Sequence, residues 1–412
     1  MTRKTNPDKL GDQLDRLRTH IVSEKKPGKS PAMPSRYARL AESLGGELVQ
    51  DAGGVFCLVT RLYEFGCSYG SVSLDSAEQS ETVAAASFSA GECEGGTALG
   101  DLVFFDTETT GLGGAGTVAF LIGCGSLTNQ GFEVRQYVLP DYSDEAGMLE
   151  RLLDELTERR TIVSYNGLAF DAPLVRDRMI VNRVARELPC QGHIDLLHAT
   201  RRLFRRRLRD CSLTNIEREI FSFYREGDIP GYLIPSVYFD WLGTENPSQL
   251  ETVLEHNRLD ILSLYFLLLH VADVFVSEGE TLESADDMYS LARVYGRRRQ
   301  HDKVADMYER METAVEGAVD PDALLYHSYS FKKTGDWEQA IGLWQQLSEG
   351  TGQEAFASNI ELAKYFEHRK KDANTALSYA RRAGQICPFE GPRRDQVRHR
   401  LARLQRKAKD LL

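Results

Sequence analysis

Residues 101–117, DLVFFDTETTGLGGAGT, constrain the fold of this 412-residue chain more than any other stretch. The apolar run 102–105, followed by turn residues, predicts a short buried strand. Alternate residues of a strand share a face, so Asp106 and Glu108 should project together beside a glycine-rich turn. Their carboxylates would repel each other, and a divalent cation between them would relieve the repulsion. A bare D-x-E is more often an acidic surface turn, so the metal interpretation depends on acids elsewhere.

The composition is that of a soluble protein, with 42% hydrophobic and 27% charged residues. The net charge of −11 argues against nonspecific coating of nucleic acid, so a polyanion would need a local basic patch or a metal ion. The seven cysteines include no C-x-x-C pair and indicate thiols in a reducing cytosol. We expect a cytoplasmic protein with no membrane partner, because the N-terminus is polar and no stretch approaches about 18 continuous apolar residues.

The patterns predict three parts. Residues 1–98 should contain a polar arm, a short helix, a small β element and a linker. Residues 99–278 should form the main α/β domain, with strands and helices in the order β-β-β-α-β-α-β, starting with an antiparallel meander. That order resembles the mixed β-sheet flanked by helices of ribonuclease H-like folds.

Residues 279–412 should be all helical. Two sets of residues recur at intervals of 34 and 36 positions: Asp302, Asp336 and Asp372, and Tyr295, Tyr329 and Tyr365. This period resembles the tetratricopeptide repeat (TPR), in which each unit is a pair of helices. The segment therefore predicts a small TPR-like solenoid that could hold a protein partner, with the basic helix at 393–409 as its cap.

Further acids follow the first pair along the chain. Asp171 comes after a predicted strand at 161–165 and an Asn166-Gly167 turn, although an aspartate in this place is more often a helix N-cap. His256 and Asp260 lie four residues apart in LEHNRLDILSL and should share one face of a helix. The apolar residues around them indicate a buried helix, in which an aspartate needs a partner.

The spacing of these acids resembles that of the DEDD 3′–5′ exonucleases, which have four carboxylates here matched by Asp106, Glu108, Asp171 and Asp260. Phosphodiester hydrolysis needs charge stabilisation on both the attacking and the leaving oxygen. Two divalent ions about 3.5 to 4 Å apart can provide it, and oxygen ligands suit Mg²⁺ or Mn²⁺.

A larger set of motifs narrows the resemblance to the YprB-like branch of the ribonuclease H-like proteins. The set comprises DTETTGLGGAGTVAFLIG, VRQYVLP, NGLAFDAPL, HIDLLHATRRLFRRRL, CSLTNIEREI, the R-x-x-D-I-P-G turn at 225–231 and EHNRLDILSL. The resemblance implies that the four acids are metal ligands and that His256 activates water. His256 lies four residues before the last aspartate, Asp260. Exonucleases of the DEDD superfamily usually have tyrosine at that spacing and place a histidine five residues before the aspartate, so this chain departs from their pattern.

Other residues are candidates for substrate contact: Thr109, Gly111, Leu112, Asn166, Phe170, Arg201 and Arg205. The last two belong to an arginine-rich run at 201–209, which could grip a nucleic-acid backbone or be a solvated helix face. His193 and Asp195 should share a strand face, more often as a structural pair than as part of a cleft.

These observations predict a two-metal 3′–5′ exonuclease-like phosphodiesterase acting on single-stranded DNA or RNA ends. Two alternatives stay open: a catalytically inactive adaptor that binds nucleic acid or protein, and a structure-selective endonuclease.

Overall fold

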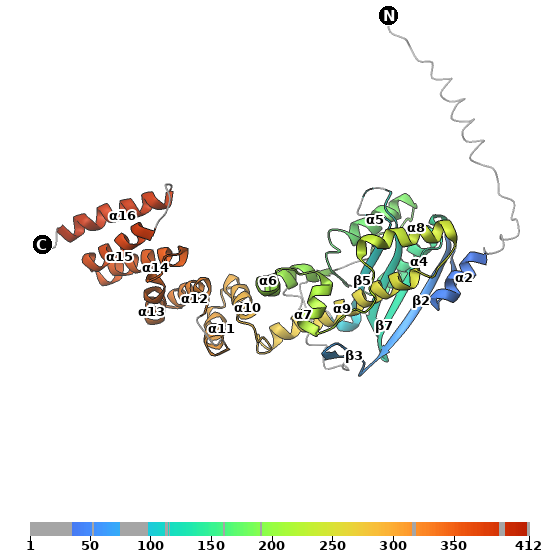
Figure 1. The fold of residues 1–412 in the computed structure, drawn as a ribbon, viewed down its shortest axis with the longest axis horizontal. Coiled ribbons are helices and arrows are strands. Elements are labelled where there is room, and N and C mark those ends of the chain that lie inside the picture. Colours follow the sequence, from blue (N-terminus) through green and yellow to red (C-terminus); the bar gives the residue numbers. More distant parts are fainter. Residues whose placement is uncertain are drawn as a thin grey trace, which may run out of the picture.

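The computed structural model describes residues 35–51, 53–74, 98–111, 114, 116–159, 161–189, 192–314, 319–386 and 392–409. The expected N-terminal arm and Leu112 lie outside these ranges. Figure 1 shows a half built on a β-sheet, from which a row of helices extends to the C-terminal end.

The sheet has seven strands in the order β1-β2-β7-β6-β5-β8-β9. Strands β5, β8 and β9 run parallel, and the remaining neighbours are antiparallel. The predicted order of elements, the antiparallel meander and the mixed sheet are thus confirmed. The strands are β1 (Glu47–Asp51), β2 (Gly54–Glu64), β5 (Leu102–Thr109), β6 (Ala119–Leu127), β7 (Gly131–Val138), β8 (Thr161–Ser164) and β9 (Gly192–Asp195).

The small β element predicted before residue 99 is not a separate unit. Strand β2 pairs with β7 along its whole second half, from Cys57 opposite Val138 to Glu64 opposite Gly131. The hairpin β1-β2 therefore extends the central sheet, because it satisfies backbone groups of β7 that would otherwise form an open edge. Among the described strands, β3 (Ser68–Tyr69) and β4 (Val72–Ser73) alone form a separate minor sheet.

Helices cover both faces of the sheet. Alternate residues of β5 belong to two different hydrophobic clusters, with Val103 and Phe105 in one and Leu102 and Phe104 in the other. The first cluster is completed by α2 (Ser35–Leu44), α4 (Glu145–Glu158), α5 (Asp171–Val181) and α8 (Ile234–Thr244). The second is completed by α6 (Leu196–Leu208), α7 (Leu213–Phe221) and most of α9 (Leu250–Val276).

Two glycines of β6 let α9 lie unusually close to the sheet. A Cβ atom at Gly123 would stand 2.3 Å from Asn257 Oδ1, and one at Gly125 would stand 2.5 Å from Ile261 Cγ2. Neither distance is compatible with a side chain, so glycine is required at both positions. The close approach places the middle of α9 beside the end of β5.

Helix α9 also meets the length and hydropathy criteria for a membrane span, but 72% of its most apolar window is buried within the protein. A core helix that lies across a sheet satisfies the same criteria. Its buried apolar residues are therefore accounted for by the packing described above.

The C-terminal part consists of helix pairs. The recurring tyrosines lie in the first helix of each pair, and Asp336 and Asp372 accept backbone hydrogen bonds from Gln339 (3.2 Å) and Thr375 (3.0 Å) at the start of the second. The interval seen in the sequence therefore equals one helix pair, while its assignment to the TPR type stays a prediction. The helices are α10 (Ala285–Arg297), α11 (His301–Ala314), α12 (Pro321–Thr334), α13 (Trp337–Ser348), α14 (Gln353–Tyr365), α15 (Ala373–Ile386) and α16 (Pro392–Lys409).

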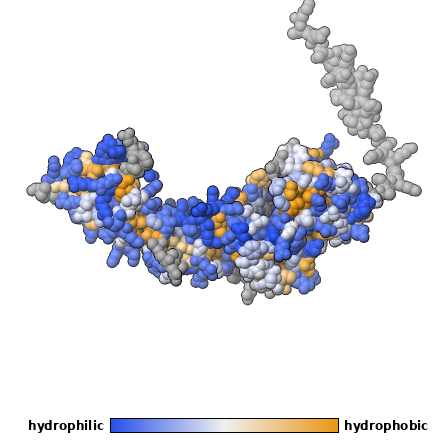
Figure 2. Space-filling view, viewed as in Figure 1, coloured by the Kyte–Doolittle hydropathy of each residue, from blue (hydrophilic) through white to orange (hydrophobic). Residues whose placement is uncertain are grey.

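The sheet and the helix pairs share one core across residue 278. A single hydrophobic cluster runs from Phe104 of β5 through α9 to Leu291 and Met307. Arg206 of α6 reinforces this junction through ion pairs with Asp286 (2.6 Å), Asp320 (2.8 Å) and Asp322 (3.0 Å). In Figure 2, strongly hydrophilic surface covers the middle of the molecule, over the junction of α6 and α10 in Figure 1.

A buried acid holds the terminal helix α16. The side chain of Glu367 is only 1% exposed and forms ion pairs with Arg400 (3.0 Å), Arg403 (2.8 Å) and Lys407 (2.9 Å). Although burial acts the other way, hydrogen bonds from Arg403 and Lys407 lower the pKa of Glu367 to about 2. The carboxylate is therefore charged at neutral pH and attracts three cations of α16.

Glu367→Gln should loosen α16 by about 2 kcal/mol, because removing one partner of a buried ion pair costs several kcal/mol and the half-exposed cations recover part of it by hydration. Hydrogen exchange should show faster exchange of the amides of residues 392–409. Glu349→Gln, which removes an exposed partner of Arg382, is the matched control and should leave that exchange unchanged. Equal exchange in both variants would contradict the anchoring role.

Candidate active site

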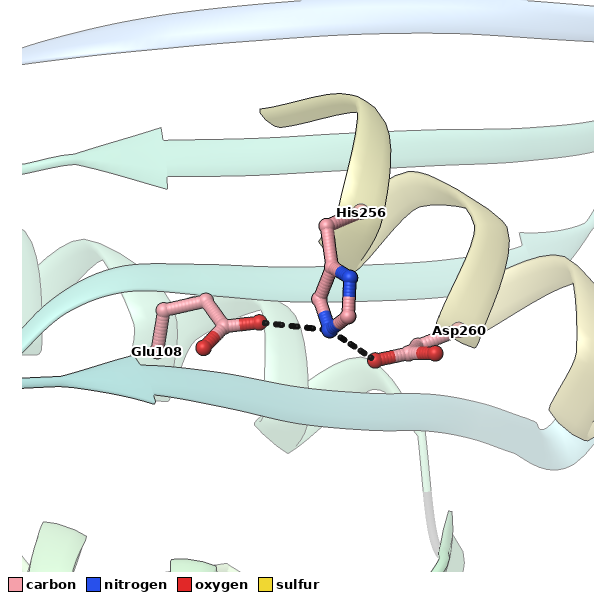
Figure 3. A group of neighbouring side chains, drawn as sticks. All are labelled: Glu108, His256 and Asp260. Atoms are coloured by element: carbon pink, nitrogen blue, oxygen red, sulfur yellow. Dashed lines mark ion pairs between the residues drawn. The ribbon is translucent and has the colours of Figure 1, made fainter. Parts of the chain in front are cut away.

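Helix α9 and the end of strand β5 meet in a cluster of three side chains, Glu108, His256 and Asp260 (Figure 3). His256 Nε2 lies 3.8 Å from Glu108 Oε1 and 3.4 Å from Asp260 Oδ2. The potential ligand atoms of all three residues lie within 4.8 Å of one another. An imidazole nitrogen and two carboxylates at this separation are a donor set that a divalent cation can use.

Asp106 lies next to this cluster on the same face of β5. Its carboxylate accepts a hydrogen bond from Asn257 Nδ2 (2.8 Å), and Asn257 Oδ1 in turn accepts one from Gln136 Nε2 (2.9 Å). Burial, followed by the charges of Asp260, Glu108 and Asp171, raises the pKa of Asp106 well above its ordinary value of 3.8. The amide of Asn257 therefore orients an acid whose charged form is disfavoured by its surroundings.

The pKa of Glu108 is also raised well above its ordinary value of 4.5. Burial is the largest cause of its raised pKa, and the charges of Asp260 and Asp171 raise the pKa further, while Arg225 acts in the opposite direction. Both residues of the D-x-E pair are thus held in low dielectric beside other acids. Such an arrangement costs free energy unless cations are added.

Asp171 begins α5, directly after the turn that follows β8. Its Oδ1 accepts a hydrogen bond from Thr107 Oγ1, the residue between the two acids of β5. Burial raises the pKa of Asp171 to about 6, although the hydrogen bond from Thr107 lowers it. The charge of Asp171 also raises the pKa of Asp106 and of Glu108, so Asp171 lies near both. Among the described residues, however, the group with ligand atoms within 4.8 Å comprises Glu108, His256 and Asp260, without Asp106 and Asp171.

An arginine that sequence reasoning did not assign to the site lies at its base. Arg225 Nη2 donates to Asp260 Oδ1, and the guanidinium also binds Glu217 through Nε (2.7 Å) and Nη2 (2.5 Å). The side chains of Arg225 and Glu217 are 4% and 1% exposed. Because burial opposes this charge, its raised pKa reflects first the attraction of Asp260 and then the bonds to Glu217. Arg225 thus fixes the rotamer of Asp260.

Asp228 is the second residue that was missed. Its Oδ1 lies 2.7 Å from His256 Nδ1, and its Oδ2 lies 3.3 Å from Arg225 Nη1. A carboxylate against Nδ1 favours the tautomer with the proton there, which leaves the Nε2 lone pair facing Glu108 and Asp260. The R-x-x-D-I-P-G turn was recognised as a motif, but its signal did not reveal which elements it faces.

The predicted substrate residues near β5 and α5 lie around the acids. Thr109 Oγ1 donates to the carbonyl oxygen of Gly111 (2.7 Å), which closes the start of the loop after β5. Phe170 directly precedes Asp171 and is 59% exposed, so its ring is available for contact. Leu112 lies outside the described residues.

The carboxylate of Asp195 stabilises the turn after β8 through hydrogen bonds. The backbone N–H groups of Asn166 (2.8 Å) and Leu168 (3.3 Å) donate to the Asp195 carboxylate, which also caps α6 at Leu197 (3.1 Å). His193 Nε2 lies 2.7 Å from Ser164 Oγ, and burial lowers the pKa of this histidine to about 4. The two residues therefore support the turn, as the structural interpretation proposed.

Arg201 and Arg205 form no hydrogen bond or ion pair with the described acids of the cluster. Both are exposed on α6, where they line two surface cavities. Their neighbours Arg206 and Arg207 are instead engaged by Asp286 and Asp287 (2.6 and 2.7 Å). The arginine-rich run thus divides into solvent-facing and structural members.

The donor set fits a hard divalent metal ion. Arg225 forms ion pairs with Glu217, Asp228 and Asp260. Its single charge does not balance the six acids described in and beside the site: Asp106, Glu108, Asp171, Glu217, Asp228 and Asp260. Burial and the neighbouring acids raise the pKa of Asp106 and Glu108, so their charged forms are disfavoured, and a bound divalent ion would favour those charged forms.

Comparisons with known proteins agree with this architecture. A family model described as RNase H superfamily matches residues 103–272, which span β5 to α9 and include the whole cluster. YprB of Bacillus subtilis (strain 168), an uncharacterized protein, is 37% identical over 314 residues that cover 74% of this chain and 75% of that protein. This chain belongs to the YprB family.

Membership of the YprB family confirms the resemblance inferred from the motif set, and the superfamily match confirms the ribonuclease H-like fold. Among solved structures, the family B DNA polymerase from the hyperthermophilic archaeon Pyrobaculum calidifontis matches with a TM-score of 0.36 and 13% identity, over 70% of this chain and 39% of the polymerase. A TM-score this low supports no conclusion about this chain.

Asp171→Asn should stabilise the metal-free protein by about 2 to 3 kcal/mol at pH 7.5, because a neutral amide replaces a buried charge whose pKa is raised from 3.8 to about 6. A raised folded-state pKa means that the wild type loses stability as the pH rises from about 4 to about 6. The gain of the variant should therefore vanish below about pH 4.

Urea denaturation in EDTA at several pH values measures this difference. Asp177→Asn, an exposed aspartate on the same helix, is the control and should change stability little at any pH. A stability difference for Asp171→Asn that did not vary with pH would contradict the assigned environment.

Proposed function

We propose that this chain is a metal-dependent phosphodiesterase that removes nucleotides from the 3′ ends of single-stranded DNA or RNA. The observation that carries the proposal is the close approach of Glu108, His256 and Asp260, with ligand atoms within 4.8 Å, beside the buried Asp106 and Asp171. Acids from a strand end, a post-strand turn and a late helix would then serve one centre.

In this proposal two Mg²⁺ or Mn²⁺ ions are held by Asp106, Glu108, Asp171 and Asp260. Bound ions of this kind stabilise negative charge on the attacking and leaving oxygens of a phosphodiester. The protein contributes the hard oxygen ligands, and it fixes two of them: Asn257 orients Asp106, and Arg225 orients Asp260.

His256 is the proposed proton acceptor for the attacking water. Asp228 would hold the proton on Nδ1, so that Nε2 presents a lone pair between Glu108 and Asp260. A neutral imidazole can take a proton from a water molecule at that place, and it can later release it to solvent. The unusual position of this histidine relative to Asp260 is compatible with that role because both project from the same face of α9.

The helix pairs α10 to α15 would hold a protein partner, as their TPR-like intervals suggest. The cysteine pattern supports a cytoplasmic location for this activity.

A second candidate function is that of an adaptor that binds nucleic acid without cutting it. It is favoured by the bond from Arg225 to Asp260, since a guanidinium already neutralises one of the four acids. Such a pair could leave too few free oxygens for two ions.

Asp106→Asn should lower the Mn²⁺-dependent release of nucleotides from a 3′-labelled single-stranded oligonucleotide by about 1,000-fold, because the centre loses a charged ligand. Asp101→Asn, an exposed aspartate just before the same strand, is the control and should keep full activity. Equally inert wild type and Asp106→Asn proteins that still bind the oligonucleotide would favour the adaptor. Cutting of circular single strands would favour an endonuclease.

Asp228→Asn should reduce kcat about 10- to 100-fold, because it removes the carboxylate that orients His256. KM should change little, because in this proposal Asp228 does not contact the substrate. Single-turnover assays would separate this effect from product release. Asp240→Asn, an exposed residue of α8, provides the comparison. A larger KM with unchanged kcat would show that Asp228 does not act through the histidine.

A further inference from the structure

An arginine-rich cavity lies away from the acid cluster. A cavity of about 590 Å³ opens between α6 and α10, and its described lining contains no carboxylate. We call this cavity the arginine groove, after the six arginines among its lining residues: Arg201, Arg202, Arg205, Arg206, Arg293 and Arg297. The groove has one wall from the sheet-containing half and one from the first helix pair.

Four of these arginines are not used to hold the protein together. Arg206 is engaged by three aspartates, but Arg201, Arg205, Arg293 and Arg297 form no ion pair with any described residue, and all four are exposed. The guanidinium of Arg293 lies over the rings of Tyr289 and Tyr326 (5.8 and 5.9 Å), which limits its motion. These four cations are therefore available to a ligand.

The positive charges in the groove repel one another. Burial lowers the pKa of Arg202, and the charges of Arg297 and Arg298 lower it further. Because the whole chain carries a net charge of −11, this positive region is a local exception. Uncompensated like charges on the walls of a concave surface raise the local concentration of anions.

The groove continues toward the acid cluster. A second cavity of about 700 Å³ shares Arg201 and Arg205 with it and adds Arg209, Asn166 and one carboxylate, Asp210, to its lining. Asn166 belongs to the turn that leads into Asp171. Arg201, Arg205 and Arg209 are spaced four residues apart, so the first two follow one another along α6 at a step of about 6 Å. A row of cations suits a ligand with regularly repeated negative charges rather than a single small anion.

We infer that the arginine groove binds the phosphate backbone of single-stranded nucleic acid and that the first helix pair thereby supplies part of the substrate grip. The groove takes the same ligand as the proposed exonuclease centre, and in that sense the inference rests on the proposed function. It assigns the helical part a direct role in binding nucleic acid, in addition to any protein partner.

The test measures binding of a fluorescent 20-nucleotide oligothymidine to the full chain in EDTA, where no hydrolysis occurs, at increasing NaCl concentrations. The variants Arg201→Ala/Arg205→Ala and Arg293→Ala/Arg297→Ala each remove two cations from opposite walls. Arg381→Ala/Arg394→Ala is the matched control, since both residues are exposed on helices far along the repeat region. Melting temperatures of all variants verify folding.

Each groove variant should raise Kd at least about tenfold and reduce the slope of log K against log salt by about 1.4, since each phosphate contact contributes about 0.7 for a single strand. The control should stay within about twofold of the wild type. Wild-type slope and affinity in the Arg293→Ala/Arg297→Ala variant would overturn the inference, because the helix pair would then contribute nothing.

The outcome is separable from that of the proposed function. Asp106→Asn should bind the oligonucleotide as the wild type does in EDTA and should fail only in hydrolysis. If hydrolysis does not depend on Asp106 while the groove variants lose binding, the catalytic proposal falls and the groove stands. If hydrolysis depends on Asp106 while the groove variants bind normally, the groove falls and the catalytic proposal stands.

Discussion

The docking of α9 onto β6 is the constraint on which the rest of the structure depends. Two glycines remove the side chains that would hold the helix away, so Asn257 and Ile261 reach the sheet backbone itself. Only at that distance can Asn257 Nδ2 bind the carboxylate of Asp106 and can His256 approach Glu108. A methyl group at Gly123 would therefore disturb the acid cluster without belonging to it.

The acid cluster lowers the stability of the folded protein. Asp106, Glu108 and Asp171 are buried beside other acids, and their pKa values are raised as a result. The fold offsets part of this cost with Arg225, which is bound to Glu217 and Asp260. A bound cation would offset the remaining repulsion between the carboxylates. Carboxyl groups with strongly shifted pKa values are typical of functional sites.

Local patterns predicted most of the fold. The alternation in β5, the turns of the meander and the helical spacing of His256 and Asp260 are short-range signals, and each element formed where it was expected. The acids could also be selected from the sequence, because their spacing matched a known family. The pairing of β2 with β7 could not be predicted, since strand patterns do not specify a distant partner.

The roles of Arg225 and Asp228 were missed for a similar reason. Both lie between helices α7 and α8, in a segment whose spatial partners are set by the packing of α9 and not by periodicity. The roles of the individual arginines in the arginine-rich run of α6 could not be predicted either. Its composition did not distinguish Arg206, which holds the helix pairs, from Arg201 and Arg205, which face solvent.

Helix α9 has a mechanical consequence as well. Its 27 residues span about 40 Å, with His256 and Asp260 in the first half and, in the second half, residues packed in the same cluster as α10 and α11. Because α9 is packed at both ends, a tilt of one end would also tilt the other. A displacement of the helix pairs would therefore act on the same helix that carries His256 and Asp260.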